Sequence, residues 1–121
     1  MSYDDSNIFA KILRGEIPCN KVYEDDFVLS FYDINPQKKI HALVIPKGKY
    51  IDLDDFNNKA SKEEIVELLK GITTVANKLG VSIAKGKGYR TLSNLGDYGG
   101  QEVPHLHFHI FSGEKVGRMV E

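Results

Sequence analysis

The sequence has little of several features that would define a protein class. It has one cysteine, Cys19, so no disulfide can form within the chain, and it has no tryptophan. No apolar run approaches the roughly 18 residues that a transmembrane helix needs. The acidic start, residues 1–5, lacks the basic and apolar regions of a signal peptide. We therefore predict a cytoplasmic protein that acts without a membrane.

An excess of charge of one sign is also missing. Sixteen Lys and Arg against 17 Asp and Glu leave a formal net charge of −1, which argues against general binding to nucleic acid. Hydrophobic residues make up 41% and charged residues 27% of the 121 residues. These are ordinary globular values and exclude disordered and collagen-like chains. Because the sequence has no repeat and no linker, we predict a single domain over residues 1–121.

The apolar spacing predicts an α+β fold. A short helix capped by Ser6 is predicted at 6–14, and a long helix that begins with a capping box at Ser61 and Glu64 is predicted at 61–79. Strands are predicted at 21–23, 27–32, 40–45, 89–95 and 105–111. Since strands cluster early and late around one long helix, we expect an antiparallel sheet of about five strands.

Three of the four histidines fall in one predicted strand. Successive strand side chains point to opposite faces, so His105, His107 and His109 should form a polar row on one face. The apolar residues between and after them, which should face a core, are Leu106, Phe108 and Ile110. His107 neighbours both other rings. It is therefore best placed to act as a nucleophile, while a neighbouring ring supplies a proton to the leaving group.

A glycine-rich loop precedes this strand. Gly99 and Gly100 can expose backbone N–H groups to an anion, and Gln101 and Asn94 add neutral donors. Such donors stabilise the charge that develops on phosphoryl oxygens during transfer. Together with three aligned imidazoles, the loop indicates a site for phosphoryl-transfer chemistry.

The segment 105–111, His-Leu-His-Phe-His-Ile-Phe, resembles the signature of the histidine triad family, in which three histidines alternate with apolar residues. Segments along nearly the whole chain resemble the Hint branch of that family: 8–12, 14–18, 33–37, 41–47, 88–90 and 99–101. The resemblance implies a HIT-like α+β fold and a homodimer. It also implies metal-independent hydrolysis of purine nucleoside phosphoramidates, derivatives of AMP or GMP, at the α-phosphorus, with no cofactor.

The resemblance further implies roles for individual residues. His107 is expected to form a nucleotidyl-histidine intermediate, and His109 to face the leaving group. His105 and His41 are expected to support them, and Asp33 to hold the ribose hydroxyls. The residues expected to line the base pocket are Phe9, Ile17 and Ile34, and those expected near the phosphate are Asn94, Gly100 and Gln101. A full triad favours hydrolysis, because the nucleotidyl-transferase branch carries glutamine at the position of His109.

The residues also allow other interpretations. His-x-His on a strand suits zinc, with His41 or Glu102 as a further ligand, which would indicate a metal-dependent hydrolase. A nucleotide-binding interaction protein with negligible turnover is another possibility. Taken alone, His41 serves equally well as a hydrogen-bonded structural histidine, and Asp33 as the cap of the turn before Pro36. Glu102 stands where many relatives have Ser or Thr and is left out of the predicted site.

Overall fold

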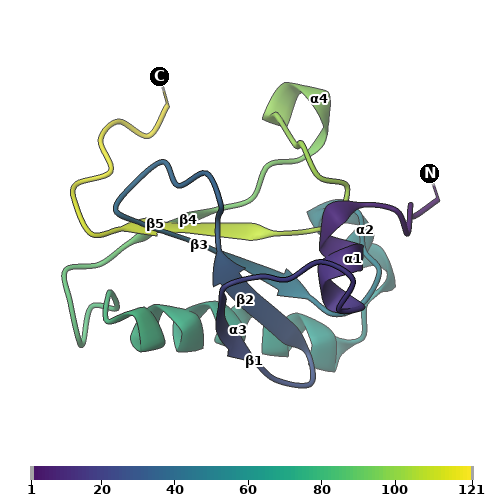
Figure 1. Ribbon diagram of the computed structural model, residues 1–121, viewed down its shortest axis with the longest axis horizontal. Coiled ribbons are helices and arrows are strands. Elements are labelled where there is room, and N and C mark those ends of the chain that lie inside the picture. Colours follow the sequence, from purple (N-terminus) through teal and green to yellow (C-terminus); the bar gives the residue numbers. More distant parts are fainter. Residues whose placement is uncertain (1, 121) are drawn as a thin grey trace.

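The chain folds around one antiparallel sheet. The computed structural model describes residues 2–120, in which five strands follow the order β1-β2-β3-β5-β4 (Figure 1). In chain order the elements are α1 (Ile8–Leu13), β1 (Lys21–Glu24), β2 (Val28–Tyr32), β3 (Ile40–Pro46), α2 (Leu53–Lys59), α3 (Lys62–Leu79), β4 (Arg90–Leu92), α4 (Gly96–Gly99) and β5 (Phe108–Ser112). The predicted α+β class with a five-stranded antiparallel sheet is confirmed.

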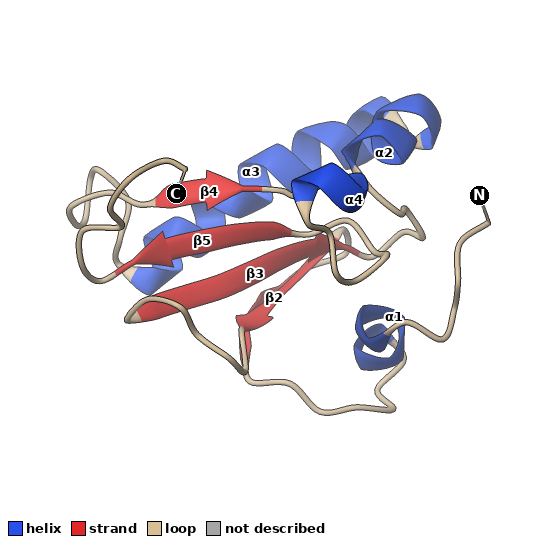
Figure 2. Cartoon of the chain, turned by 90° about the horizontal axis from the view of Figure 1, so that it is seen from above, coloured by secondary structure: helices blue, strands red, loops and turns tan. Residues whose placement is uncertain are grey.

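Two apolar cores lie on opposite faces of this sheet, which separates α3 from α1 (Figure 2). On one face, α3 packs onto the strands through residues that include Leu68, Ile72 and Val75. On the other face, Phe9 of α1 packs with Leu29, Phe31, Leu43 and Ile45. The central strand β3 is buried on both faces, which explains its nearly continuous apolar sequence.

The long helix α3 follows the prediction closely. Ser61 and Glu64 form the capping box, and Gly80 ends the helix at a φ of 75°, a left-handed conformation that favours glycine. Gly71, which lowers helix propensity, lies where a Cβ atom would come within 3.1 Å of a Val28 methyl group. A glycine at this position therefore lets α3 approach β2 closely.

Several predicted boundaries differ from the structure. The cap of α1 is Asn7 rather than Ser6, because the Asn7 side chain accepts the Ala10 N–H (2.9 Å) while the Ser6 hydroxyl bonds to Asp4. The strand predicted at 89–95 is shorter in the structure, where β4 spans only three residues. The strand predicted at 105–111 begins at Phe108, because the segment before it bonds outside the sheet ladder.

Two helices were not predicted. The short helix α2 begins at the cap Asp52, whose side chain accepts the Asp55 N–H, and it buries Phe56. The single turn α4 lies within the glycine-rich loop and buries no side chain. Neither has the repeated apolar face by which sequence periodicity reveals a helix. Within residues 2–120, no helix is both long and apolar enough to cross a membrane.

The capping box of α3 should contribute measurably to stability. In Ser61→Ala, the Glu64 N–H loses its side-chain acceptor, and we expect the free energy of unfolding to fall by about 1 kcal/mol. Urea unfolding followed by circular dichroism measures this. Thr74→Ala is the control, because the Thr74 hydroxyl donates to the Lys70 carbonyl within the same helix and takes no part in the cap. Equal stability of both variants and the parent would contradict this role for Ser61.

Candidate active site

Two of the three triad histidines, His105 and His107, lie against Phe9 of α1. His105 is fully buried and His107 is 7% exposed, while His109 in β5 is half-buried. Their alternation with Leu106, Phe108 and Ile110, which pack into the α3-side core, agrees with the prediction. The Phe9 ring lies edge-on to His107, with ring centroids 5.0 Å apart, and helps to bury that side chain.

His107 has its tautomer set by the backbone. Its Nδ1 lies 2.7 Å from the carbonyl oxygen of His105. A carbonyl oxygen only accepts, so Nδ1 carries the proton and donates it. The lone pair of the neutral ring is therefore on Nε2, which is the form required of a nucleophile. The Ser93 hydroxyl donates to the His107 carbonyl oxygen (2.8 Å) and holds the same residue from the β4 side.

His109 is given the opposite tautomer by His41. The Gln37 N–H donates to Nδ1 of His41 (3.1 Å), so His41 carries its proton on Nε2. That Nε2–H donates to Nδ1 of His109 over 2.9 Å. Neutral His109 then has its proton on Nε2. The ring centroids of His107 and His109 are 5.2 Å apart. A ring with a lone pair on Nε2, His107, is therefore next to a ring with a proton on Nε2, His109.

His105 connects the triad to the end of β3 and to the N-terminal segment. Its Nε2–H donates to the Pro46 carbonyl oxygen (2.9 Å). Its Nδ1 accepts from the Tyr3 hydroxyl (2.5 Å). Both nitrogens of this buried ring are satisfied, so His105 supports its neighbours and has no nitrogen left for substrate.

Burial keeps this histidine group neutral. Desolvation, together with the proximity of His107, lowers the pKa of both His105 and His109 to about 4. Desolvation also lowers the pKa of His107 and of His41, although the Asp33 carboxylate acts in the opposite direction on both. At neutral pH the His107 lone pair is therefore available without prior loss of a proton.

Asp33 fills the turn role, one of the two that the sequence left open. Its Oδ1 accepts the Asn35 N–H (2.8 Å), which forms the turn before Pro36. Its Oδ2 lies 3.4 Å from Nε2 of His41, with the side chain partly exposed. One carboxylate oxygen thus shapes the turn and the other remains near the histidines with acceptor capacity for a ligand hydroxyl.

The glycine-rich loop is arranged differently from the prediction. The N–H groups of Gly99 and Gly100 donate to the carbonyls of Leu95 and Asp97, at the cap and in the turn of α4. The prediction that these N–H groups are free to bind an anion was therefore wrong. The Gln101 side chain is also engaged, since its Nε2 donates to the carbonyls of Ile51 (2.7 Å) and Val103 (3.0 Å). Gln101 therefore fixes the loop against the connection between β3 and α2.

The three residues expected to line the base pocket differ from one another in burial and in neighbours. Phe9 is buried against His107 and Phe31. Ile17 is half-buried, and Ile34 is 85% exposed beside Asp33. The exposed Ile34 side chain has no core role and leaves apolar surface available to a ligand.

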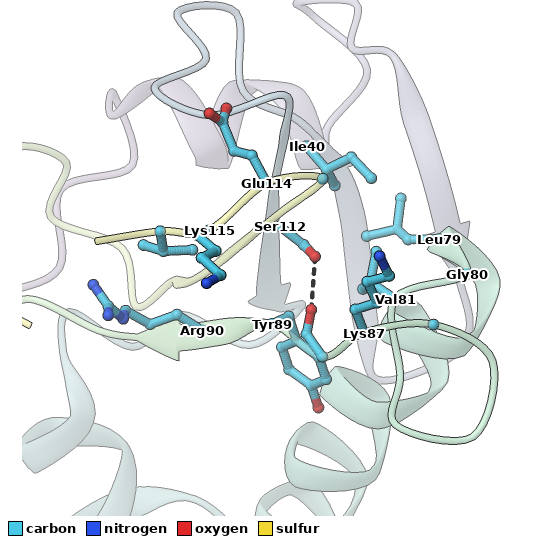
Figure 3. Close-up of a pocket in the computed structure, with 14 residues that line it drawn as sticks. Ile40, Leu79, Gly80, Val81, Lys87, Tyr89, Arg90, Ser112, Glu114 and Lys115 are labelled. Atoms are coloured by element: carbon cyan, nitrogen blue, oxygen red, sulfur yellow. Dashed lines mark hydrogen bonds between the residues drawn. The ribbon is translucent and has the colours of Figure 1, made fainter. Parts of the chain in front are cut away.

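A cavity of about 320 Å³ lies beside His109, and Asn94 lines it. The cations Lys38, Arg90 and Arg118 also line this cavity. A larger cavity of about 720 Å³ lies at the far end of β5, between the end of α3 and the tail (Figure 3). None of the histidines lines it, and the Ser112 hydroxyl there donates to the Gly88 carbonyl. Of the histidines, His109 lines the smaller cavity, and His107 lines neither of the two.

Among residues 2–120, one group could offer three ligand atoms to a metal ion: Asp33, His41 and His109. Those atoms lie within 4.8 Å of one another, but His41 and His109 are already hydrogen-bonded through them. The group differs from the predicted rival, which used the triad with His41 or Glu102. Glu102 is exposed and lies outside it. The donor atoms fit proton transfer without rearrangement, whereas metal binding would break that hydrogen bond.

An antiparallel sheet that brings together three alternating histidines, kept neutral by burial, is typical of a histidine triad protein. In agreement, the family model described as HIT domain matches residues 14–116. The chain belongs to the HIT family, and the resemblance seen in the sequence is confirmed.

Individual relatives cover nearly all of the chain. An uncharacterized HIT-like protein of Azospirillum brasilense is 52% identical over 119 residues, which cover 98% of this chain and 95% of that protein. The purine nucleoside phosphoramidase of Escherichia coli K12 is 40% identical over 118 residues, covering 96% and 94%. The solved structure of a HIT family hydrolase from Clostridium thermocellum has a TM-score of 0.86 at 33% identity, covering 98% and 99%.

Two residues that contact the triad were missed by the sequence analysis. Tyr3 bonds to His105, and Ser93 bonds to the backbone of His107. Neither lies in a motif with a recognisable spacing, and Tyr3 is 102 residues away from its partner. Only the folded structure brings them to the site.

Neutral buried histidines should make stability fall in acid. The unfolded chain protonates His105 near its usual pKa of 6.5, whereas the folded chain does so near 4. As pH falls from about 6.5 towards 5, the unfolded state binds more protons, so the free energy of unfolding decreases by about 1.4 kcal/mol per pH unit for this histidine. Above 6.5 this contribution is complete and constant. Urea unfolding at pH 5 to 7.5 measures the slope.

The matched variant for this slope is His105→Gln, whose amide can still bond to both partners but does not titrate. Its unfolding free energy should depend less steeply on pH over the same range. A parent slope no greater than that of the variant would show that His105 does not resist protonation in the fold.

Proposed function

We propose that this protein hydrolyses purine nucleoside phosphoramidates, AMP or GMP derivatives, at the α-phosphorus. The single observation that carries the proposal is the pair of opposite tautomers, with a lone pair on Nε2 of His107 beside a proton on Nε2 of His109. A nucleophile next to an acid is what cleavage of a P–N bond requires. The name of the Escherichia coli relative supports this substrate class.

In the first step, Nε2 of His107 forms a bond to phosphorus and the P–N bond breaks. The negative charge of the substrate favours uptake of one proton by the hydrogen-bonded His41–His109 pair. Nε2 of His109 gives this proton to the departing nitrogen, which leaves as an amine. The product is a nucleotidyl-His107 intermediate, whose Nδ1–H still donates to the His105 carbonyl.

In the second step, water attacks the same phosphorus. Nε2 of His109, now unprotonated, takes the proton of the water molecule. The bond between phosphorus and His107 breaks, and the nucleoside monophosphate and the neutral histidine are released. His109 thus serves as acid and then as base, which is why a histidine at this position favours hydrolysis over stable transfer to another nucleotide.

The remaining site residues bind the nucleotide in this proposal. Asp33 accepts hydrogen bonds from the ribose hydroxyls through its free Oδ2. The Asn94 amide donates to the phosphate from the cavity beside His109. Ile17 and Ile34 contact the base, with Phe9 behind them, and Gly100 leaves space at the phosphate side because a Cβ there would meet nothing within 4 Å.

His107→Ala should abolish turnover but keep nucleotide binding. The substitution removes the nucleophile and none of the proposed ribose or phosphate contacts, so we expect turnover of an adenosine phosphoramidate to fall at least about 1,000-fold. Isothermal titration with AMP should give a dissociation constant within a few-fold of the parent. Release of AMP is followed by chromatography.

Two arms separate this mechanism from its rivals. Turnover by His107→Ala equal to that of the parent would refute the assigned nucleophile, and a parent that binds AMP without turnover would be an interaction protein. Turnover lost after exhaustive chelation and restored by a divalent metal would indicate a metal-dependent hydrolase. The proposed mechanism requires turnover that chelation leaves unchanged.

We also propose that the protein works in the cytoplasm as a homodimer. β4 is an edge strand with unpaired backbone groups on one side, and Thr91 within it is exposed. Such an edge can pair with the same strand of a second copy. Light scattering after size-exclusion chromatography should give about twice the chain mass of 13.6 kDa. A mass equal to one chain at micromolar concentration would refute the dimer.

A further inference from the structure

Tyr3 reaches the triad from a segment that no motif covers. Its hydroxyl lies 2.5 Å from Nδ1 of His105, and the two rings meet edge-on with centroids 5.6 Å apart. The segment is held in place at Asp5, which forms an ion pair with Lys49 (2.9 Å) and whose carbonyl accepts from Arg14 (2.9 Å). The segment that carries Tyr3 is therefore tied to the rest of the chain two residues after Tyr3.

The hydrogen bond has a fixed direction. The Pro46 carbonyl requires a proton on Nε2 of His105, so neutral His105 has its lone pair on Nδ1. The Tyr3 hydroxyl donates to this lone pair. Among residues 2–120, it is the one hydrogen-bond partner of Nδ1 of His105. Burial raises the pKa of Tyr3, so the hydroxyl keeps the proton that it donates.

The buried ring of His105 leads directly to the nucleophile. The carbonyl of His105 is the acceptor that sets the tautomer of His107. The segment that carries both residues lies before β5 and outside the sheet ladder. Its backbone is held by isolated bonds, such as Leu106 N–H to the Tyr50 carbonyl and the Ser93 hydroxyl to the His107 carbonyl. The ring of His105 bonds to the Pro46 carbonyl and to the Tyr3 hydroxyl. These two hydrogen bonds therefore hold the segment in place, as ladder hydrogen bonds hold a strand.

We propose that Tyr3 is a positioning residue, which holds His105 in one tautomer and one orientation and thereby aims His107 at the phosphorus. This inference rests on the proposed function for its kinetic consequence. It concerns the rate of the chemical step rather than nucleotide affinity, because Tyr3 bonds to His105 and to none of the proposed nucleotide contacts.

Loss of the hydroxyl should also change the acid behaviour of the site. A donor to Nδ1 stabilises the neutral ring, so its removal leaves Nδ1 free to take a proton. The ionisable groups around this pair are His107 beside His105, and Asp5, Lys49 and Arg14 around Tyr3. A positively charged His105 would disturb the adjacent His107, so the variant should lose activity at a higher pH than the parent does.

Tyr3→Phe tests the proposal because it removes the hydroxyl and keeps the ring. We expect kcat for an adenosine phosphoramidate to fall about tenfold, with KM within about twofold, and the acid limb of kcat to move up by about one pH unit. Tyr23→Phe is the matched control, because the Tyr23 hydroxyl also bonds to one side chain, Asp25, in β1 and away from the triad. Its kcat and pH profile should equal those of the parent.

The nitrogen resonances of the histidine rings provide a readout that does not depend on turnover. In the parent, NMR should show His105 neutral with its proton on Nε2 down to acid pH, and in Tyr3→Phe this ring should take up a second proton at a higher pH. An inactive parent that shows this difference would refute the proposed function and support the role of Tyr3. A Tyr3→Phe variant with the kinetics, pH profile and His105 titration of the parent would overturn the inference.

Discussion

The site depends on one hydrogen bond between adjacent parts of the same segment, from Nδ1–H of His107 to the carbonyl of His105. A backbone carbonyl cannot donate, so it selects one tautomer of the ring that bonds to it. The lone pair of His107 is fixed on Nε2 by this bond alone. The bonds of the His105 ring to Pro46 and Tyr3 hold the residue that carries this carbonyl.

Burial gives the same site its chemical state. A row of exposed histidines would be partly protonated near neutral pH, and repulsion among the charges would oppose their close approach. Phe9 of α1 packs against His105 and His107, and burial keeps the rings neutral, so each can be both donor and acceptor. Phe9, which the sequence analysis assigned to a base pocket, thus shields His107 from water.

The sequence predicts most of the fold because its signals are periodic and local. The capping box at Ser61 and the glycine at position 80 bound α3 correctly, and the histidine alternation gives the right faces. The alternation could not show that the strand begins at Phe108, since the preceding backbone bonds to Tyr50 across the chain. Likewise, the exposed glycines of the loop suggested free donors, but a turn of helix uses their N–H groups internally. Contacts made at long range, such as that of Tyr3, have no local pattern.

Strand β3 has a consequence for which changes the chain can tolerate. The two ends of β3 contact the two outer histidines, since His41 bonds to His109 and the Pro46 carbonyl bonds to His105. The separation of these two points along β3 must therefore match the separation of the histidines on the neighbouring segment. Apolar substitutions between them alter only packing, whereas inserting or deleting one residue would detach one histidine from its support. Evolution should accordingly conserve the length of this strand more strictly than its composition.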